Sequence, residues 1–118
     1  MRHEEVDLDD IHKQKEVIRA EIEDHPVMLY MKGMRSMPMC GFSGRVIDIL
    51  EEINIEFETR DVLTNPVLRR AIKEFSDWPT LPQLYVNGEF IGGCDIIVAL
   101  HLAGELAPLC RSALEPNS

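Results

Sequence analysis

The apolar run from Val27 to Met31 constrains the fold more than any other segment of this chain. A strand with one solvated face alternates apolar and polar residues, whereas a continuous apolar run is expected of a strand buried on both faces in a parallel sheet. A helical apolar pattern follows over residues 41–53, and a second strand is predicted over residues 55–59. A strand, a helix and a strand in this order form a βαβ unit.

Capping and turn residues locate most of the remaining elements. Asp9 or Asp10 can cap a helix that ends before His25-Pro26, and Asn65-Pro66 is a typical helix start. Asn87-Gly88, between two short apolar runs, is the strongest short hairpin signal. The other predicted elements are a loop over residues 32–39, a helix from residue 66 through Phe75, strands over residues 83–86 and 89–91, and helices over residues 95–103 and from there to about residue 114.

This order of elements predicts an α/β protein with a thioredoxin-like fold, a four-stranded mixed sheet flanked by helices. We expect one domain over residues 10–114, a disordered acidic tail over residues 1–9 and a C-terminal tail over residues 115–118. The share of hydrophobic residues, 45%, is that of an ordinary soluble protein. No apolar stretch approaches the roughly 20 residues of a membrane helix, and no signal peptide opens the chain, so we expect no membrane association.

The charge distribution is uneven along the chain. The net charge of −9 argues against nucleic acid as a partner. Yet residues 26–47 and 62–73 contain no acidic residue, and their charged residues are all basic: Lys32, Arg35, Arg45, Arg69, Arg70 and Lys73. Cys40 lies in the first of these segments, so we interpret them as a positive environment for its sulfur.

Cys40 opens a Cys-x-x-Ser tetrapeptide that resembles a redox Cys-x-x-Cys motif with its second sulfur replaced by the Ser43 hydroxyl. A dithiol resolves a mixed disulfide with its second thiolate, and a serine hydroxyl cannot do this. Cys40 therefore either forms a mixed disulfide with a small thiol or serves as a single metal ligand. Its position just before a helix, with Lys32 at the end of the preceding strand, predicts a lowered thiol pKa.

The other cysteines do not pair with Cys40 in any recognisable framework. Three cysteines at wide spacing argue against a secreted disulfide scaffold and favour a reducing compartment. Cys110 is expected to be buried and structural. Cys94 has three interpretations: a small residue at a helix start, a second thiol that bridges to Cys40 on oxidation, or a thiol that takes a small thiol as a mixed disulfide. The four histidines are scattered without metal-ligand spacing.

Four motifs together resemble the monothiol glutaredoxins of the CGFS class, from about residue 18 to residue 106. They are Met31-Lys32-Gly33, Cys40-Gly41-Phe42-Ser43, the run from Trp78 to Glu89 with Trp78-Pro79-Thr80-Leu81-Pro82 at its start, and Gly92-Gly93-Cys94-Asp95-Ile96. Two positions depart from the family. Leu81 stands where Phe is more common, and residues 34–39 lack the usual Thr-Pro and carry three methionines, which suggest a softer and more oxidisable rim around Cys40.

The resemblance implies a glutathione site. Lys32 and Arg69 would hold the glycine carboxylate, with Arg70 and Lys73 as competitors for the second role. The main chain of Leu81, before a cis Pro82, would pair with the cysteinyl unit, and the helix start at Gly93, Cys94 and Asp95 would hold the γ-glutamyl end. The predicted binding residues are Lys32, Cys40, Phe42, Arg69, Thr80, Leu81, Pro82, Gly93, Cys94 and Asp95.

The function that the resemblance implies is an iron–sulfur cluster carrier. A [2Fe–2S] cluster needs four ligands, commonly thiolates. Cys40 from two chains and the thiols of two glutathiones complete this set, so we expect a monomer without the cluster and a homodimer with it. BolA-like and iron–sulfur recipient proteins are implied partners, in the mitochondrial matrix or alternatively the bacterial cytoplasm. A weak glutathione-dependent oxidoreductase is the alternative, and a redox-sensing thioredoxin-like interaction module is the third hypothesis.

Overall fold

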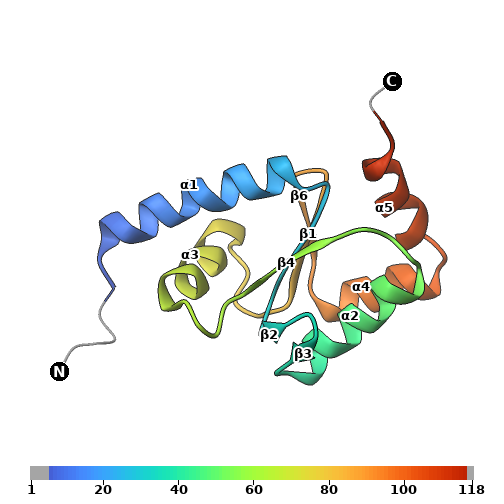
Figure 1. Ribbon diagram of the computed structural model, residues 1–118, viewed down its shortest axis with the longest axis horizontal. Coiled ribbons are helices and arrows are strands. Elements are labelled where there is room, and N and C mark those ends of the chain that lie inside the picture. Colours follow the sequence, from blue (N-terminus) through green and yellow to red (C-terminus); the bar gives the residue numbers. More distant parts are fainter. Residues whose placement is uncertain (1–5, 117–118) are drawn as a thin grey trace.

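A four-stranded mixed sheet forms the centre of the computed structural model, which describes residues 6–116 (Figure 1). The strand order is β4-β1-β5-β6, with β1 parallel to β4 and antiparallel to β5. The thioredoxin-like fold predicted from the sequence is confirmed. The strands of this sheet are β1 Val27–Met31, β4 Glu58–Asp61, β5 Gln83–Val86 and β6 Glu89–Gly92, and the helices are α1 Leu8–Asp24, α2 Gly41–Glu52, α3 Pro66–Ser76, α4 Cys94–Leu102 and α5 Leu106–Leu114.

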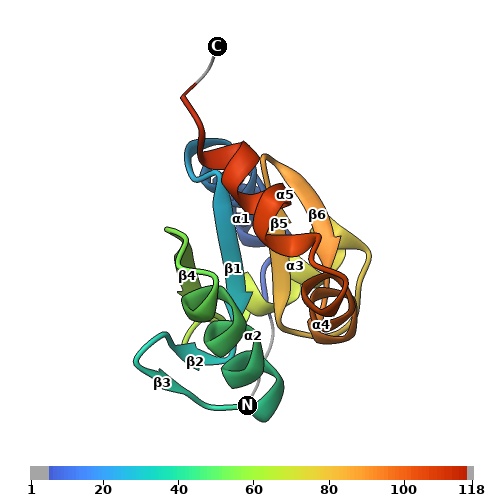
Figure 2. The same ribbon diagram turned by 90° about the vertical axis from the view of Figure 1, so that its right-hand side faces the viewer.

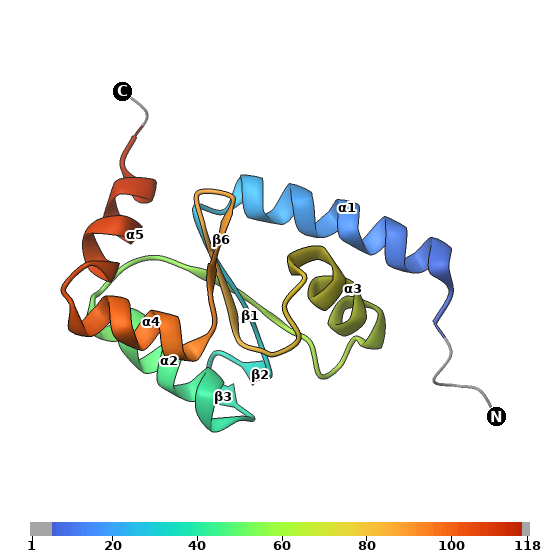
Figure 3. The same cartoon turned by 180° about the vertical axis from the view of Figure 1, so that it is seen from behind.

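Helices cover both faces of the sheet, which is why β1 is apolar throughout. Figures 1 and 3 show α1 and α3 on one face and α2, α4 and α5 on the other. Met28 and Tyr30 pack into the core under α1 and α3, whereas Val27, Leu29 and Met31 pack into the core under the other three helices. All five side chains are at most 1% exposed. The continuous apolar run is therefore a strand buried on both faces, as predicted.

Two predicted boundaries were displaced. The first helix begins at Leu8, because Asp7 rather than Asp9 or Asp10 caps it, with its side chain accepting a hydrogen bond of 2.9 Å from the Asp9 N–H. The helix thus includes the last two residues of the predicted acidic tail. Residues 1–5 of this tail lie outside the described part of the chain, as do residues 117–118 of the predicted C-terminal tail.

The second strand lies later than residues 55–59. Ile55 and Phe57 are buried in the core beside α2, and their alternation imitates a strand. The chain joins the sheet only at Glu58, which is opposite Met28. Burial alone therefore produced the apolar pattern that predicted the strand too early.

The predicted loop over residues 32–39 contains a small hairpin, β2 Gly33–Met34 and β3 Met37–Pro38. Figure 2 shows this β2–β3 hairpin beside the first turn of α2. The Asp61 carboxylate accepts the Gly33 N–H at 2.9 Å and so fixes the start of the hairpin to the end of β4. Gly33 has φ +94°, and a Cβ atom there would lie 2.5 Å from the Met39 nitrogen, so only glycine fits.

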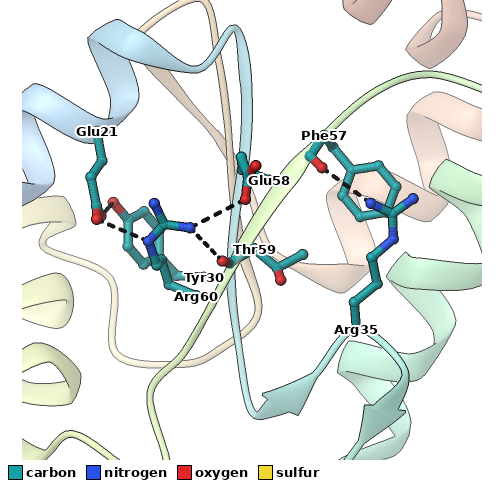
Figure 4. A network of polar contacts seen from close by, with 7 residues as sticks. All are labelled: Glu21, Tyr30, Arg35, Phe57, Glu58, Thr59 and Arg60. Carbon is teal, nitrogen blue, oxygen red and sulfur yellow. Dashed lines mark hydrogen bonds and ion pairs between the residues drawn. The ribbon is translucent and has the colours of Figure 1, made fainter.

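A polar network ties α1, β1 and β4 together (Figure 4). The Tyr30 hydroxyl donates to Glu21 at 2.9 Å, and Arg60 donates to Glu21 at 2.9 Å and to Glu58 at 3.3 Å. Burial, together with the charge of Glu21, raises the pKa of Tyr30 well above its ordinary value. The network fixes the edge strand β4 beside β1. Lys32 directly follows the last residue of β1.

Among the described residues, no single helix has the length and apolar composition of a membrane span. Only α4 and α5 taken together pass that test, and they meet at a bend of 99°.

Candidate functional site

Cys40 is the N-cap residue of α2, with extended backbone angles of φ −153° and ψ 139°. Its half-buried side chain therefore lies at the helix end where backbone N–H groups have no helical acceptors. Burial raises the pKa of the Cys40 thiol, but hydrogen bonds from the Ser43 and Phe42 N–H groups and from the Ser43 hydroxyl, with the charge of Lys32, outweigh it. The net result is a lowered pKa, so the thiolate is available closer to neutral pH.

This balance refines the prediction for Cys40. The lowered pKa is as expected, but the charge of Lys32 contributes less to it than the hydrogen bonds of the first turn of α2 do. Ser43 matters more than the sequence indicated. Its side chain is fully buried, and its hydroxyl oxygen accepts the Lys32 N–H at 3.1 Å. The hydroxyl therefore joins the end of β1 to the thiolate.

A cavity of about 370 Å³ opens beside Cys40. It has the size of a small-molecule site. The motifs lie far apart in the sequence but meet here, because the end of β1, the loop before β5 and the start of α4 all lie at the same edge of the sheet. Eight of the predicted binding residues line the cavity: Lys32, Cys40, Phe42, Thr80, Leu81, Gly93, Cys94 and Asp95.

Two of the basic residues considered for the glycine carboxylate, Lys32 and Lys73, line the cavity. Lys73 lines the wall, whereas Arg69 does not. Burial lowers the pKa of Lys73, and so do the nearby charges of Arg69 and Lys32, so the three cations form one positive group. Arg70 instead donates to Glu74 at 3.0 Å in an exposed pair. Helical spacing had grouped Arg69 with Lys73, and the tertiary structure decides which of them reaches the cavity.

The start of α4 forms another part of the cavity wall. Gly93 is its N-cap residue, and Asp95 lies in the first turn. A Cβ atom on Gly93 would lie 3.3 Å from the Pro82 carbonyl oxygen and 3.4 Å from the Trp78 indole nitrogen, so glycine permits this close approach. The Leu81-Pro82 peptide bond is cis, as expected. Pro82 itself is not on the cavity wall.

Aromatic and aliphatic side chains complete the cavity. Phe42 and Trp78 both line it and are 62% and 38% exposed, so they belong to the wall more than to the core. The sequence reasoning did not single out Pro79 and Ile96, which line it as well. Both belong to the motifs quoted above, so the motifs located this part of the wall although neither residue was predicted to bind a ligand.

The two other cysteines differ sharply from Cys40. Burial raises the pKa of the Cys94 thiol, and so do the neighbouring Asp95 and Cys40, against the opposing charge of Arg45. Burial raises the pKa of Cys110 to about 11, and its side chain is fully buried, as predicted. Over the described residues all three cysteines are free thiols, and only Cys40 has a lowered pKa.

Residues 6–116 bring together no group of three or more histidine, cysteine, aspartate or glutamate side chains that could hold a metal ion. A metal centre at Cys40 would therefore take most of its ligands from outside the chain.

Known proteins resemble this chain in sequence along most of its length. The sequence profile of the glutaredoxin family matches residues 27–91. The chain is 47% identical over 100 residues to "Probable monothiol glutaredoxin 2" of Rickettsia conorii, covering 85% of this chain and 94% of that protein. It is 46% identical over 108 residues to "Monothiol glutaredoxin-5, mitochondrial" of Schizosaccharomyces pombe, covering 87% and 74% of the two.

Some relatives are much longer. The chain spans only 17% of "Monothiol glutaredoxin-S17" of Arabidopsis thaliana and 55% of "Monothiol glutaredoxin-S7, chloroplastic" of rice.

Solved structures share the fold. Reduced apo GrxS14 of poplar superposes with a TM-score of 0.75 at 45% identity, covering 85% of this chain and 92% of that one. A buckwheat glutaredoxin–glutathione complex superposes with a TM-score of 0.82 over 92% and 96% of the chains. Its identity is 18%, so it shows the common fold alone.

Proposed function

Since the chain belongs to the glutaredoxin family, as a monothiol glutaredoxin, we propose that it binds glutathione beside Cys40 and carries a [2Fe–2S] cluster between two subunits. One observation carries this proposal. Cys40 is the only described thiol with a lowered pKa, and it lies on the wall of a cavity that is also lined by two cations, Lys32 and Lys73, and by the N-terminus of α4.

The cavity suits a peptide with a carboxylate at each end. Lys32 and Lys73, with Arg69 behind them, would hold the glycine carboxylate through charge-assisted hydrogen bonds. The α4 N-terminus would bind the γ-glutamyl carboxylate, and the Asp95 side chain would take its ammonium group. The Leu81 main chain would pair with the middle of the peptide. These contacts direct the thiol of glutathione toward Cys40.

The donor set then decides the stoichiometry of the cluster. A [2Fe–2S] cluster takes four ligands. Each chain offers one activated thiolate, because Cys94 has a raised pKa and Cys110 is inside the core. Two chains and two glutathiones supply the four sulfurs. Since half of them belong to dissociable small molecules, the cluster is suited to transfer, and we treat it as cargo.

The same reasoning extends to partners and location. We propose that iron–sulfur recipient proteins and BolA-like proteins approach the exposed Cys40 side of the molecule. We place the protein in the mitochondrial matrix, with the bacterial cytoplasm as the alternative, because the relatives include one named mitochondrial and one from Rickettsia.

Anaerobic reconstitution with iron, sulfide and glutathione tests the proposal. The visible absorption of a [2Fe–2S] cluster should form with the unmodified chain and be lost in Cys40→Ser. The matched controls Cys94→Ser and Cys110→Ser should retain most of it. Omission of glutathione should be nearly as damaging as loss of Cys40. A stable cluster in Cys40→Ser would contradict the proposal, as would one formed without any small thiol.

A glutathione-dependent oxidoreductase is the second candidate, and the lowered pKa of Cys40 favours it. The thiolate would attack the glutathione sulfur of a protein mixed disulfide and release the protein thiol. Free glutathione would then attack the Cys40–glutathione disulfide, which releases oxidised glutathione and regenerates the thiolate. Steady turnover of a glutathionylated peptide, with no loss of rate when iron is excluded, would favour this activity over the carrier.

A further inference from the structure

Gln83 is fully buried, which is unusual for an amide side chain. It is the first residue of β5 and lies opposite Tyr30 of β1. Since side chains alternate along a strand, Gln83 lies on the same face of the sheet as Tyr85. A buried amide is unfavourable unless its hydrogen bonds are made, so the partners of Gln83 indicate what the side chain does.

The Gln83 amide has a hydrogen-bond partner for both of its polar atoms. Its Nε2 atom donates to the Trp78 carbonyl and to the Thr80 carbonyl, each at 3.1 Å. Its Oε1 atom accepts the Tyr85 hydroxyl at 3.3 Å. An amide nitrogen has two protons, so both are used. The reversed amide would turn Oε1 toward two carbonyl oxygens, so the partners themselves fix its orientation.

Both carbonyls belong to a segment that lines the cavity without a break. Residues 78–81, which we call the cavity loop, belong to no helix or strand, and all four line the cavity: Trp78, Pro79, Thr80 and Leu81. The loop is attached to α3 at its start, because the Trp78 N–H donates to the Lys73 carbonyl at 3.2 Å. Pro79 has no N–H to donate, which leaves the next part of the loop with fewer backbone hydrogen bonds. Gln83 binds this part from within the core.

We infer that Gln83 is a positioning residue that holds the cavity loop ready for glutathione. This role rests on the proposed function, in which the Leu81 main chain pairs with the middle of the peptide. Gln83 does not line the cavity, so it acts through the loop and not on the ligand.

The peptide unit between Thr80 and Leu81 connects the two sides of the loop. It is trans and planar, so the Thr80 carbonyl and the Leu81 N–H point in opposite directions. Because Gln83 holds this carbonyl, the Leu81 N–H is fixed pointing away from the Gln83 amide. A donor that is already oriented loses less entropy when a ligand binds.

Tryptophan fluorescence tests the positioning role without any ligand. Trp78 is the only tryptophan of the chain, and its partly exposed ring lies 5.9 Å from the ring of Phe90. Gln83→Met keeps a side chain of similar volume and removes both donors. In the folded, glutathione-free protein this substitution should increase the quenching of the fluorescence by acrylamide, because the loop loses its attachment to the core.

Calorimetry with reduced glutathione gives the second readout. Gln83→Met should weaken binding about tenfold, which corresponds to about 1.4 kcal/mol. Gln83→Asn keeps the amide but is one methylene shorter, so it cannot hold both carbonyls and should change both readouts in the same direction. Gln83→Asn decides the question if Gln83→Met does not fold.

Arg111→Met is the matched control for a loss of stability alone. It also removes a side-chain donor from a backbone carbonyl, that of Ile53 at 3.0 Å, but in α5 and outside the cavity wall. It should lower the free energy of unfolding in urea and leave the quenching and the affinity for glutathione unchanged.

Two results would overturn the positioning role. One is that the Gln83 variants keep the quenching and the affinity of the unmodified chain. The other is that Arg111→Met changes both readouts as much as they do. An unmodified chain that does not bind glutathione would refute the proposed function instead, and the quenching of Trp78 would still decide whether Gln83 holds the cavity loop.

Discussion

Replacing Ser43 by alanine separates the two roles that its hydroxyl has in the structure. The hydroxyl oxygen accepts the Lys32 N–H at 3.1 Å, and the hydroxyl donates a hydrogen bond to the Cys40 sulfur. Ser43→Ala leaves a partly buried N–H without this acceptor, which costs about 1–3 kcal/mol. Alanine regains roughly 0.5 kcal/mol through its higher helix propensity. The free energy of unfolding should therefore fall by about 0.5–2.5 kcal/mol.

The same substitution should raise the pKa of Cys40, because it removes the hydrogen bond from the Ser43 hydroxyl, one of the interactions that together outweigh burial, while the backbone N–H of residue 43 remains. Urea unfolding measures the first effect, and the pH dependence of the rate of iodoacetamide alkylation measures the second. Ser36→Ala, in the exposed turn of the β2–β3 hairpin, is the matched control and should change neither. If Ser43→Ala left both the stability and the alkylation midpoint unchanged, the hydroxyl would not link β1 to the thiolate as we argue.

Three further predictions follow from single contacts. The midpoint of the Cys40 alkylation rate against pH should lie below the free-thiol pKa of about 8.5, since the fold stabilises the thiolate. Cys110 is buried and should be alkylated only on unfolding, which mass spectrometry of the labelled protein would show. Lys73→Met should weaken glutathione binding about tenfold by calorimetry, and Arg70→Met, whose cation is paired outside the cavity, should not. Gly33→Ala should lower the urea midpoint by an amount equivalent to about 2 kcal/mol or more. The reason is that Gly33 has φ +94° and a Cβ atom there would lie 2.5 Å from the Met39 nitrogen. An unchanged midpoint would contradict this geometry.

The pH dependence of stability has opposite signs at two cysteines. The lowered pKa of Cys40 contributes stability that is present above about pH 8.5 and is lost as the pH falls through the folded value. The pKa of Cys110, raised to about 11, contributes stability below about pH 8.5 that is lost as the pH rises toward 11. Comparing the urea midpoints of Cys110→Ala and the unmodified chain at neutral and alkaline pH checks the second sign. The difference between the two should shrink as the pH rises.

Most of the fold could be predicted because its signals are local. The apolar run of β1, the Asn87-Gly88 turn and the Asn65-Pro66 helix start each specify an element within a few residues. The β2–β3 hairpin was missed because its strands are two residues long and its turn, Arg35-Ser36, has no glycine or asparagine. It is stabilised instead by long-range contacts, such as the bond from the Gly33 N–H to Asp61.

The candidate site was predictable to the extent that motifs mark it. The tetrapeptide at Cys40 and the glycine pair before α4 both lie where the sequence placed them. The sequence could not predict that Lys73 rather than Arg69 lines the cavity, because both lie on one face of the helix and only the packing of α3 against the sheet distinguishes them. The bond between Ser43 and Lys32 joins residues 11 positions apart and carries no sequence signature.

Native mass spectrometry of the cluster-loaded protein tests the central proposal most directly. After anaerobic reconstitution, the mass should equal that of two chains, one [2Fe–2S] cluster and two glutathiones, and removal of the cluster should return single chains. This composition follows from one activated thiolate per chain. A loaded species containing a single chain, or a dimeric one without glutathione, would contradict it.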